Sequence, residues 1–266
     1  MTSDSLRSRA LAALLLNEPA EKAAAAGMLS ADLPVSPDTL FPEPQGIPGR
    51  PGRPELVPPQ KVKRRSMNSP QGRAALIHSL AHIEFNAINL ALDILWRFPG
   101  MPDAFYRDWA RVAREEALHF GMLRRHLESL GHAYGDMPAH DGLWEMAERT
   151  RGSLLARLAL VPRTLEARGL DASPLVRSKL AEAGDHEGAA IIDIILRDEV
   201  GHVALGNTWY RHECARQGLD PVDQFKRLAA QYRAPRLRGP FNIEARLAAG
   251  FTEQELQVLH HDALGV

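Results

Sequence analysis

The side chains most able to do chemistry stand in two short strings of one form, an acidic residue followed by Glu-x-x-His. The first string is Glu115–His119 (EEALH) and the second is Asp198–His202 (DEVGH). Each lies within a long stretch of helical pattern. Glu and His three residues apart share one helix face, so both can reach the same metal ion. Carboxylate and imidazole ligands without sulfur favour iron or manganese over a structural zinc ion.

A glutamate on the apolar face of the preceding helical stretch accompanies each string. Glu84 precedes Glu116 by 32 residues, and Glu166 precedes Glu199 by 33 residues. The repeated spacing predicts an internal duplication of a helical pair, which is far more specific than one Glu-x-x-His string. The duplication gives six candidate metal ligands: Glu84, Glu116, His119, Glu166, Glu199 and His202.

The spacing around Gly100 predicts how the first glutamate pair meets. Glu84 lies 16 residues before Gly100 and Glu116 lies 16 residues after it. In an antiparallel hairpin with its tip at Gly100, both glutamates therefore stand about 24 Å from the tip and face each other.

The second pair leaves an alternative open. Glu166 is close to the end of its expected helix, while Glu199 lies well inside the next one. Glu148 falls on the same helical stripe as Glu166 and is the rival ligand. Glu166 is preferred because its spacing to Glu199 matches that of Glu84 to Glu116.

Charge balance explains how such groups could share an apolar interior. A buried carboxylate must be paired, protonated or bound to metal. Four carboxylates and two neutral imidazoles around two divalent ions sum to zero charge. Glu115 and Asp198 each precede a candidate ligand. They could accept the second N–H of a ligand histidine on another helix, and an inter-helix or surface ion pair is the alternative for both.

The elements that must position these residues are helices. We expect one short helix in residues 1–30, a proline-rich extended strap in 31–70, and a helical bundle in 71–217 followed by a helical extension in 218–266. The sequence lacks an alternating run of β-branched residues of the kind that would predict a strand. The expected helices after residue 70, with a kink at Pro162, are 71–98, 102–130, 142–168, 174–183, 185–217, 221–232, 242–249 and 253–264.

Composition excludes several classes of protein. The net charge of −1 gives no overall field for nucleic acid or an anionic membrane. The single cysteine, Cys214, excludes an internal disulfide and a cysteine-based cluster and fits a reducing cytoplasm. No apolar run approaches the ~20 residues of a membrane span.

The order Glu, Glu-x-x-His, Glu, Glu-x-x-His resembles that of the ferritin-like di-iron carboxylate superfamily. Strings such as AHIEFNAINLALD (81–93), YGDMPAHDGLWEMA (134–147), ALVPRTLEARGLD (159–171) and ILRDEVGHVALG (195–206) resemble one bacterial branch, the uncharacterised domain of unknown function 455. The likeness covers most of the chain. It implies a four-helix bundle with an N-terminal helix, a strap and extra C-terminal helices, which holds two iron ions through the six ligands; manganese or a mixed pair is the alternative.

This resemblance favours an O2-dependent oxidase or hydroxylase that takes electrons from an external donor. An iron-binding protein or ferroxidase without an organic substrate is the alternative, and a buried ion-pair network with Arg163 and Arg168 is the third hypothesis. The substrate, a small molecule or a tRNA, stays open, as does the subunit number, with a homodimer among the options. Two basic clusters bear on tRNA: Lys61–Arg65 (KVKRR), and the group Arg233, Arg236 and Arg238.

Overall fold

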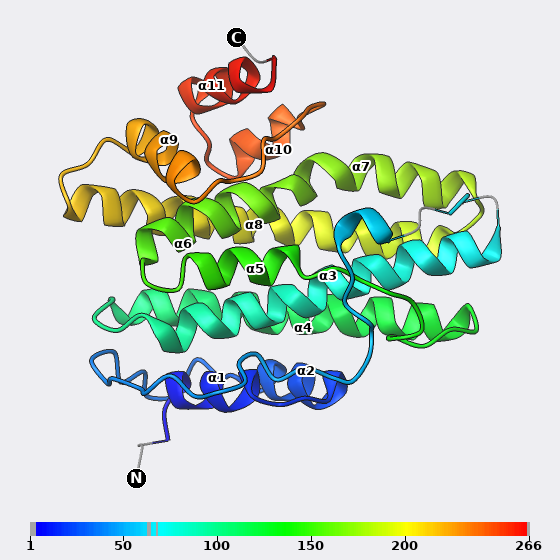
Figure 1. Cartoon of the computed structure of the whole chain (residues 1–266), viewed down its shortest axis with the longest axis horizontal. Coiled ribbons are helices and arrows are strands. Elements are labelled where there is room, and N and C mark those ends of the chain that lie inside the picture. Colours follow the sequence, from blue (N-terminus) through cyan, green and yellow to red (C-terminus); the bar gives the residue numbers. More distant parts are fainter. Residues whose placement is uncertain (1–3, 63–64, 68, 265–266) are drawn as a thin grey trace. The chain divides into compact units, whose positions relative to one another are not determined.

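Helices are the main regular secondary structure of the described residues. The computed structural model describes residues 4–62, 65–67 and 69–264, and side chains as far as His260 (Figure 1). Within these ranges the only strand-like pairing is an isolated parallel bridge between Leu56 and Ala139. The prediction of an all-α fold is therefore confirmed. No helix in the described ranges has both the length and the apolar character needed to cross a bilayer.

The chain divides into two compact units. The first comprises Met1–Glu145 and Leu180–Ile191, and the second comprises Met146–Lys179 and Ile192–Val266. The sequence-based division at residues 70 and 217 stays a prediction.

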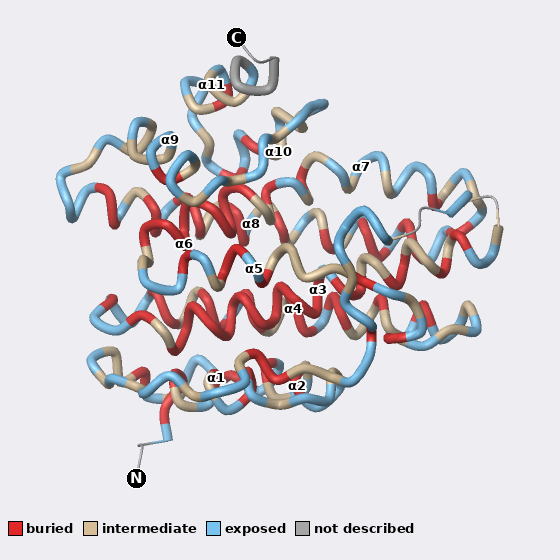
Figure 2. The backbone as a smooth tube through the Cα atoms, viewed as in Figure 1, coloured by how far each residue is buried: buried red, intermediate tan, exposed pale blue. Residues whose placement is uncertain are grey.

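The first unit is built on a hairpin of two long helices, α3 (Pro70–Arg97) and α4 (Asp103–Ser129). Ser69 caps α3 by accepting the N–H of Gly72, and Gly100 turns the chain with a φ of +77°, a conformation that favours glycine. The expected bounds are confirmed to within one residue. Figure 2 shows long buried runs on both helices.

Two short helices cover the hairpin. α1 (Leu6–Leu14) packs on α3, and α2 (Pro19–Gly27) packs on α4. The prediction of a single helix in residues 1–30 is wrong because Pro19 starts a new helix: it has no N–H to donate, and it holds Glu18 in an extended conformation.

Buried cations attach the proline-rich strap to this unit. Apart from the 3₁₀ turn η1 (Pro59–Lys61), the described strap is not helical, as expected. Arg7 is fully buried. Its guanidinium donates to carbonyls of the strap and of the last turn of α3: Ser36, Pro37, Thr39, Leu95 and Trp96. One side chain thus pairs helix-end carbonyls that have no partner within the helix.

The second unit departs most from the sequence-based expectation. The predicted helix 142–168 is interrupted after α5 (Gly142–Arg149); α6 (Leu154–Leu160) begins at the Ser153 cap, and a π-helical segment, η2 (Val161–Glu166), follows it. A π-helical turn at Pro162 thus replaces the expected simple kink. Thr164 Oγ1 donates to the Ala159 carbonyl at 2.9 Å, which pairs one acceptor in this irregular stretch.

The helix α7 (Ala167–Glu182) runs without a break through Gly169 and Pro174. The predicted stop at Gly169 and the separate helix 174–183 are therefore wrong. Ala167 and Leu170 flank Gly169 and are buried in one cluster with Val203 and Ala249. This packing keeps the backbone helical where the local signals favour a break.

The remaining helices follow the predicted bounds closely. They are α8 (His186–Arg216), α9 (Pro221–Gln231), α10 (Ile243–Ala248) and α11 (Glu253–Leu264). Asp220, Asn242 and Thr252 cap α9, α10 and α11 through their side chains. The last three helices belong to the second unit.

Gly206 lets η2 approach α8 closely. A Cβ at Gly206 would lie 2.5 Å from Pro162 Cβ, whereas a Cβ at Gly201 on the same helix would meet nothing within 4 Å. We expect Gly206→Ala to lower the free energy of unfolding by about 1–3 kcal/mol through overpacking. The control Gly201→Ala should raise it by about 0.5–1 kcal/mol because alanine is the better helix former. Urea unfolding measures both, and equal effects would contradict this packing.

Candidate metal centre

Three of the predicted ligands meet inside the hairpin of the first unit. His119 Nδ1 lies 3.3 Å from Glu84 Oε2 and 3.5 Å from Glu116 Oε2. All three side chains are buried, with Glu116 and His119 at 0% exposure. The structure thus brings Glu84 of α3 to the height of Glu116 on α4, as their equal spacing from Gly100 predicts. We call these three residues the first triad.

The helices present the first triad through ordinary periodicity. Glu116 and His119 lie one turn apart on the buried face of α4, while Leu118 between them is exposed. Glu84 lies on a face of α3 whose neighbours at helical spacing are buried and apolar: Ala81, Ala87, Ile88 and Ala91. The carboxylates therefore sit in a setting that strongly disfavours isolated charge.

Electrostatics in the first triad favour the retention of protons when no metal is bound. Burial raises the pKa of Glu84 well above its usual range, and the neighbouring Glu116 charge adds to this rise. Burial opposes the charge on His119, but the Glu116 and Glu84 carboxylates outweigh it and raise the His119 pKa to about 11. The His119 pKa leaves a proton on the imidazole at neutral pH, and a bound cation would displace it.

The second unit carries the repeated string. Glu199 and His202 lie one turn apart on α8, both buried, with His202 Nδ1 at 3.8 Å from Glu199 Oε1. Glu166 is half-buried at the end of η2. We call Glu166, Glu199 and His202 the second triad, and their joint role stays a prediction. Glu199, like Glu84, Glu116 and His119, is a buried residue whose side chain offers a donor atom suited to a metal ion.

The rival ligand Glu148 lies in a different setting. Its side chain is 41% exposed and lies 4.0 Å from Arg151. Glu148 shares a helical stripe with Glu166 only if residues 142–168 form one continuous helix. The interruption after Arg149 removes this shared face. The observed exposure of Glu148 favours Glu166 as the candidate.

The two carboxylates beside the strings differ in their contacts. Asp198 accepts hydrogen bonds from the adjacent Arg197 guanidinium at 2.8 and 3.2 Å. This contact is an ion pair, which is the alternative role that the sequence analysis gives for Asp198. Glu115 is half-buried on α4. For both residues, a contact with a ligand histidine stays a prediction.

Sequence reasoning missed an aromatic cluster beside the first triad. His82 is buried, and it contacts Tyr134 Oη at 2.8 Å and the His140 carbonyl at 3.1 Å. Tyr134 stacks on His78 and His82 and contacts the rings of Phe85 and Phe120, which adjoin Glu84 and His119 in sequence. Burial lowers the pKa of both histidines to about 4, so they are neutral at pH 7.

The i, i+4 spacing of His78 and His82 was the available signal, but their partner Tyr134 lies in a loop whose path the sequence does not reveal. Asp185 is also buried, at the start of α8. It accepts the N–H of Gly188 at 2.9 Å and pairs with His126.

Comparison with known proteins gives one family and no fold. The family model described as "Protein of unknown function (DUF455)" matches residues 14–257. An uncharacterized protein of Haemophilus influenzae is 49% identical over 230 residues, which cover 83% of this chain and 80% of that protein. No solved structure matches the chain significantly.

Proton release on metal binding tests the electrostatics of the first triad. We expect ferrous or manganous ions to displace at least about one proton when they bind the metal-free protein. Calorimetry in buffers of different ionisation enthalpy would show this as a buffer-dependent heat. Glu84→Gln should reduce the number of protons released, whereas the control Glu128→Gln, which changes an exposed side chain of α4, should not. A heat that is the same in every buffer would contradict the assignment.

Proposed function

We propose that this chain, which belongs to the DUF455 family, binds two metal ions and uses them in an O2-dependent oxidation. Iron is the preferred metal. The proposed ligands are the first triad and the second triad together, held in a ferritin-like four-helix arrangement. The observation that carries the proposal is the buried Glu84–Glu116–His119 group, whose glutamate and Glu-x-x-His pattern is repeated at Glu166 and Glu199-x-x-His202.

The donor set fits such ions. Buried carboxylates and an imidazole, without sulfur, suit iron or manganese, and a mixed pair of the two satisfies the same chemistry. Six ligands carrying four negative charges balance two divalent cations. Together with the protons retained by the first triad, this balance favours a cation as the intended partner of the buried acids.

A purely structural ion-pair network is the weaker explanation. The buried cation in that hypothesis, Arg163, pairs with Glu255, and Arg168 is exposed. A buried ion-pair network is costly to maintain, because desolvation of both partners opposes folding. Metal binding would offset that desolvation cost.

When bound, a pair of ferrous ions would supply electrons for the reduction of O2, and an external donor would restore them. The residues of the two triads would hold and orient the ions and keep bulk water away from them. An iron-binding protein or ferroxidase without an organic substrate would need the same ligands. We favour oxidation of an organic substrate because the strap and α9–α11 are additions that a compact storage-shell subunit does not need.

Two classes of substrate are proposed, a tRNA and a small organic molecule. For tRNA, the chain offers exposed Arg233, Arg236 and Arg238, together with the run Lys61–Arg65. Lys63 and Arg64 of that run lie outside the described residues. A small organic molecule is the other class of substrate.

Metal analysis of ligand variants tests the proposal. Protein from iron-supplemented cells should contain about two irons per chain and consume O2 after anaerobic reduction. Glu116→Ala and Glu199→Ala should lose iron and O2 consumption because each removes a proposed ligand. Elemental analysis and an oxygen electrode provide the measurements.

A matched pair of variants resolves the ligand in the second unit. Glu166→Ala should lose iron, while Glu148→Ala should keep it because that side chain is 41% exposed and lies 4.0 Å from Arg151. Folded protein that binds no metal under any loading condition would sink the proposal and restore the ion-pair network as the explanation.

A further inference from the structure

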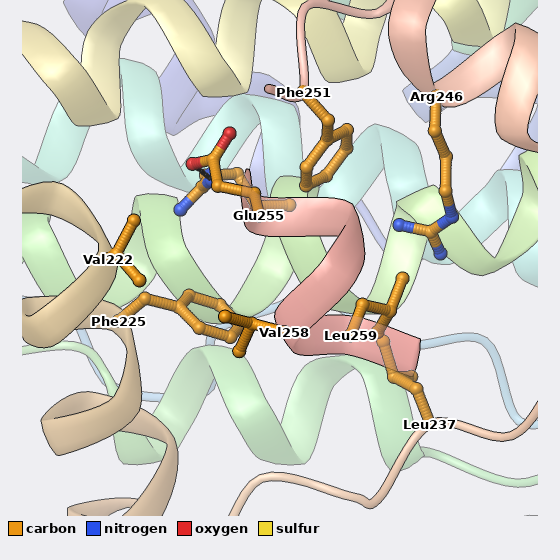
Figure 3. A pocket seen from close by; sticks show the side chains of 9 residues that line it. Val222, Phe225, Leu237, Arg246, Phe251, Glu255, Val258 and Leu259 are labelled. Atoms are coloured by element: carbon orange, nitrogen blue, oxygen red, sulfur yellow. Dashed lines mark hydrogen bonds and ion pairs between the residues drawn. The ribbon is translucent and has the colours of Figure 1, made fainter. Parts of the chain in front are cut away.

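The second unit contains a pocket among its last helices. Residues of η2, α9, α10, α11 and the segments between them line it, and it encloses about 500 Å³ of empty space, part of it open to solvent (Figure 3). None of the six candidate metal ligands lines the pocket.

The lining is apolar apart from three charged side chains. The charged residues are Arg163, Arg246 and Glu255. The apolar residues are Val222, Phe225, Leu237, Phe251, Val258 and Leu259. Such a lining would suit a molecule with one polar end and a short apolar body.

Arg163 is the unusual member of this lining. It is only 3% exposed, and its guanidinium carbon lies 4.3 Å from the centre of the Tyr210 ring and 5.3 Å from those of Phe225 and Phe251. Nε donates to Asn207 and Nη2 donates to Glu255. Nη1 is buried, and nothing in the described residues accepts its hydrogens. A buried charged donor without an acceptor is costly, so this atom points to a missing ligand.

The charges around the pocket do not balance. Arg246 is matched by Asp171, which accepts from it at 2.9 and 2.7 Å. Glu255 is shared, because Arg211 also donates to it at 2.9 Å. The group therefore contains three guanidiniums and two carboxylates, with one positive charge in excess.

We propose that this pocket binds a small aliphatic monocarboxylate. Its carboxylate accepts from Arg163 Nη1 and supplies the missing negative charge, and its carbon chain lies against the apolar lining. A phosphate fits less well because it carries up to two charges and several acceptor oxygens, while the remaining lining is apolar. The proposal does not depend on the metal centre.

Direct binding to the full-length protein tests the polar end of this ligand. The probes are straight-chain carboxylates from acetate to octanoate, measured by calorimetry with and without chelator. Affinity should rise with chain length until the pocket is filled. The alcohol and the alkylammonium ion of the best length should each bind about tenfold more weakly or not at all, because neither supplies a negative acceptor. Alcohols that bind as tightly as carboxylates would overturn the proposal.

A pair of tryptophan variants tests the location. Leu237 is a half-buried lining residue, so Leu237→Trp should fill the pocket and weaken carboxylate binding about tenfold or more. The control Leu247→Trp changes a 44% exposed residue of α10 that does not line the pocket, and it should leave binding unchanged. Carboxylate binding of unchanged affinity by folded Leu237→Trp would contradict this location. A lack of carboxylate binding by the unaltered protein would overturn the proposal, and the pocket would then hold only water.

Discussion

Burial of two carboxylates and an imidazole between α3 and α4 is the constraint on which the rest of the account depends. Glu84, Glu116 and His119 lie within hydrogen-bonding or ion-pairing reach of one another and away from water. Such a group cannot contribute to stability as an apolar core would, since desolvation of charge opposes folding. Residues that destabilise the metal-free fold in this way are more readily explained by a function than by packing. Binding of a cation would offset this unfavourable desolvation free energy.

The surrounding structure holds this group in place. Arg7 connects the strap to the end of α3 through backbone carbonyls. Lys22 of α2 connects the strap to the interior of α3 by donating to the Gly49 carbonyl and to Asn89 Oδ1. The Tyr134 cluster packs rings beside the residues that adjoin the triad in sequence. The strap thus stiffens the hairpin through buried polar contacts, which helps to explain why so proline-rich a segment accompanies a helical protein.

The sequence predicted the parts of the structure that depend on local signals. Pro99 and Gly100 end one helix, and equal spacing from that turn places Glu84 opposite Glu116. The sequence-based helix bounds were wrong between Gly142 and Glu182. There, Gly169 and Pro174 favour breaks in the helix, but the tertiary packing of Ala167 and Leu170 overrides these local signals. The π-helical turn at Pro162 and the path of the Tyr134 loop also depend on contacts between distant residues. Local patterns cannot encode such contacts, so the buried state of His82 was missed for the same reason.

Mössbauer spectroscopy tests the central claim most directly, because it distinguishes paired from isolated iron. The whole chain would be loaded anaerobically with isotope-enriched ferrous iron and then exposed to O2. The account predicts ferrous iron that converts to a magnetically coupled ferric pair, with the signal lost in Glu116→Ala. Isolated ferric ions, or iron that washes out of correctly folded protein, would contradict a two-metal centre at these glutamates and histidines.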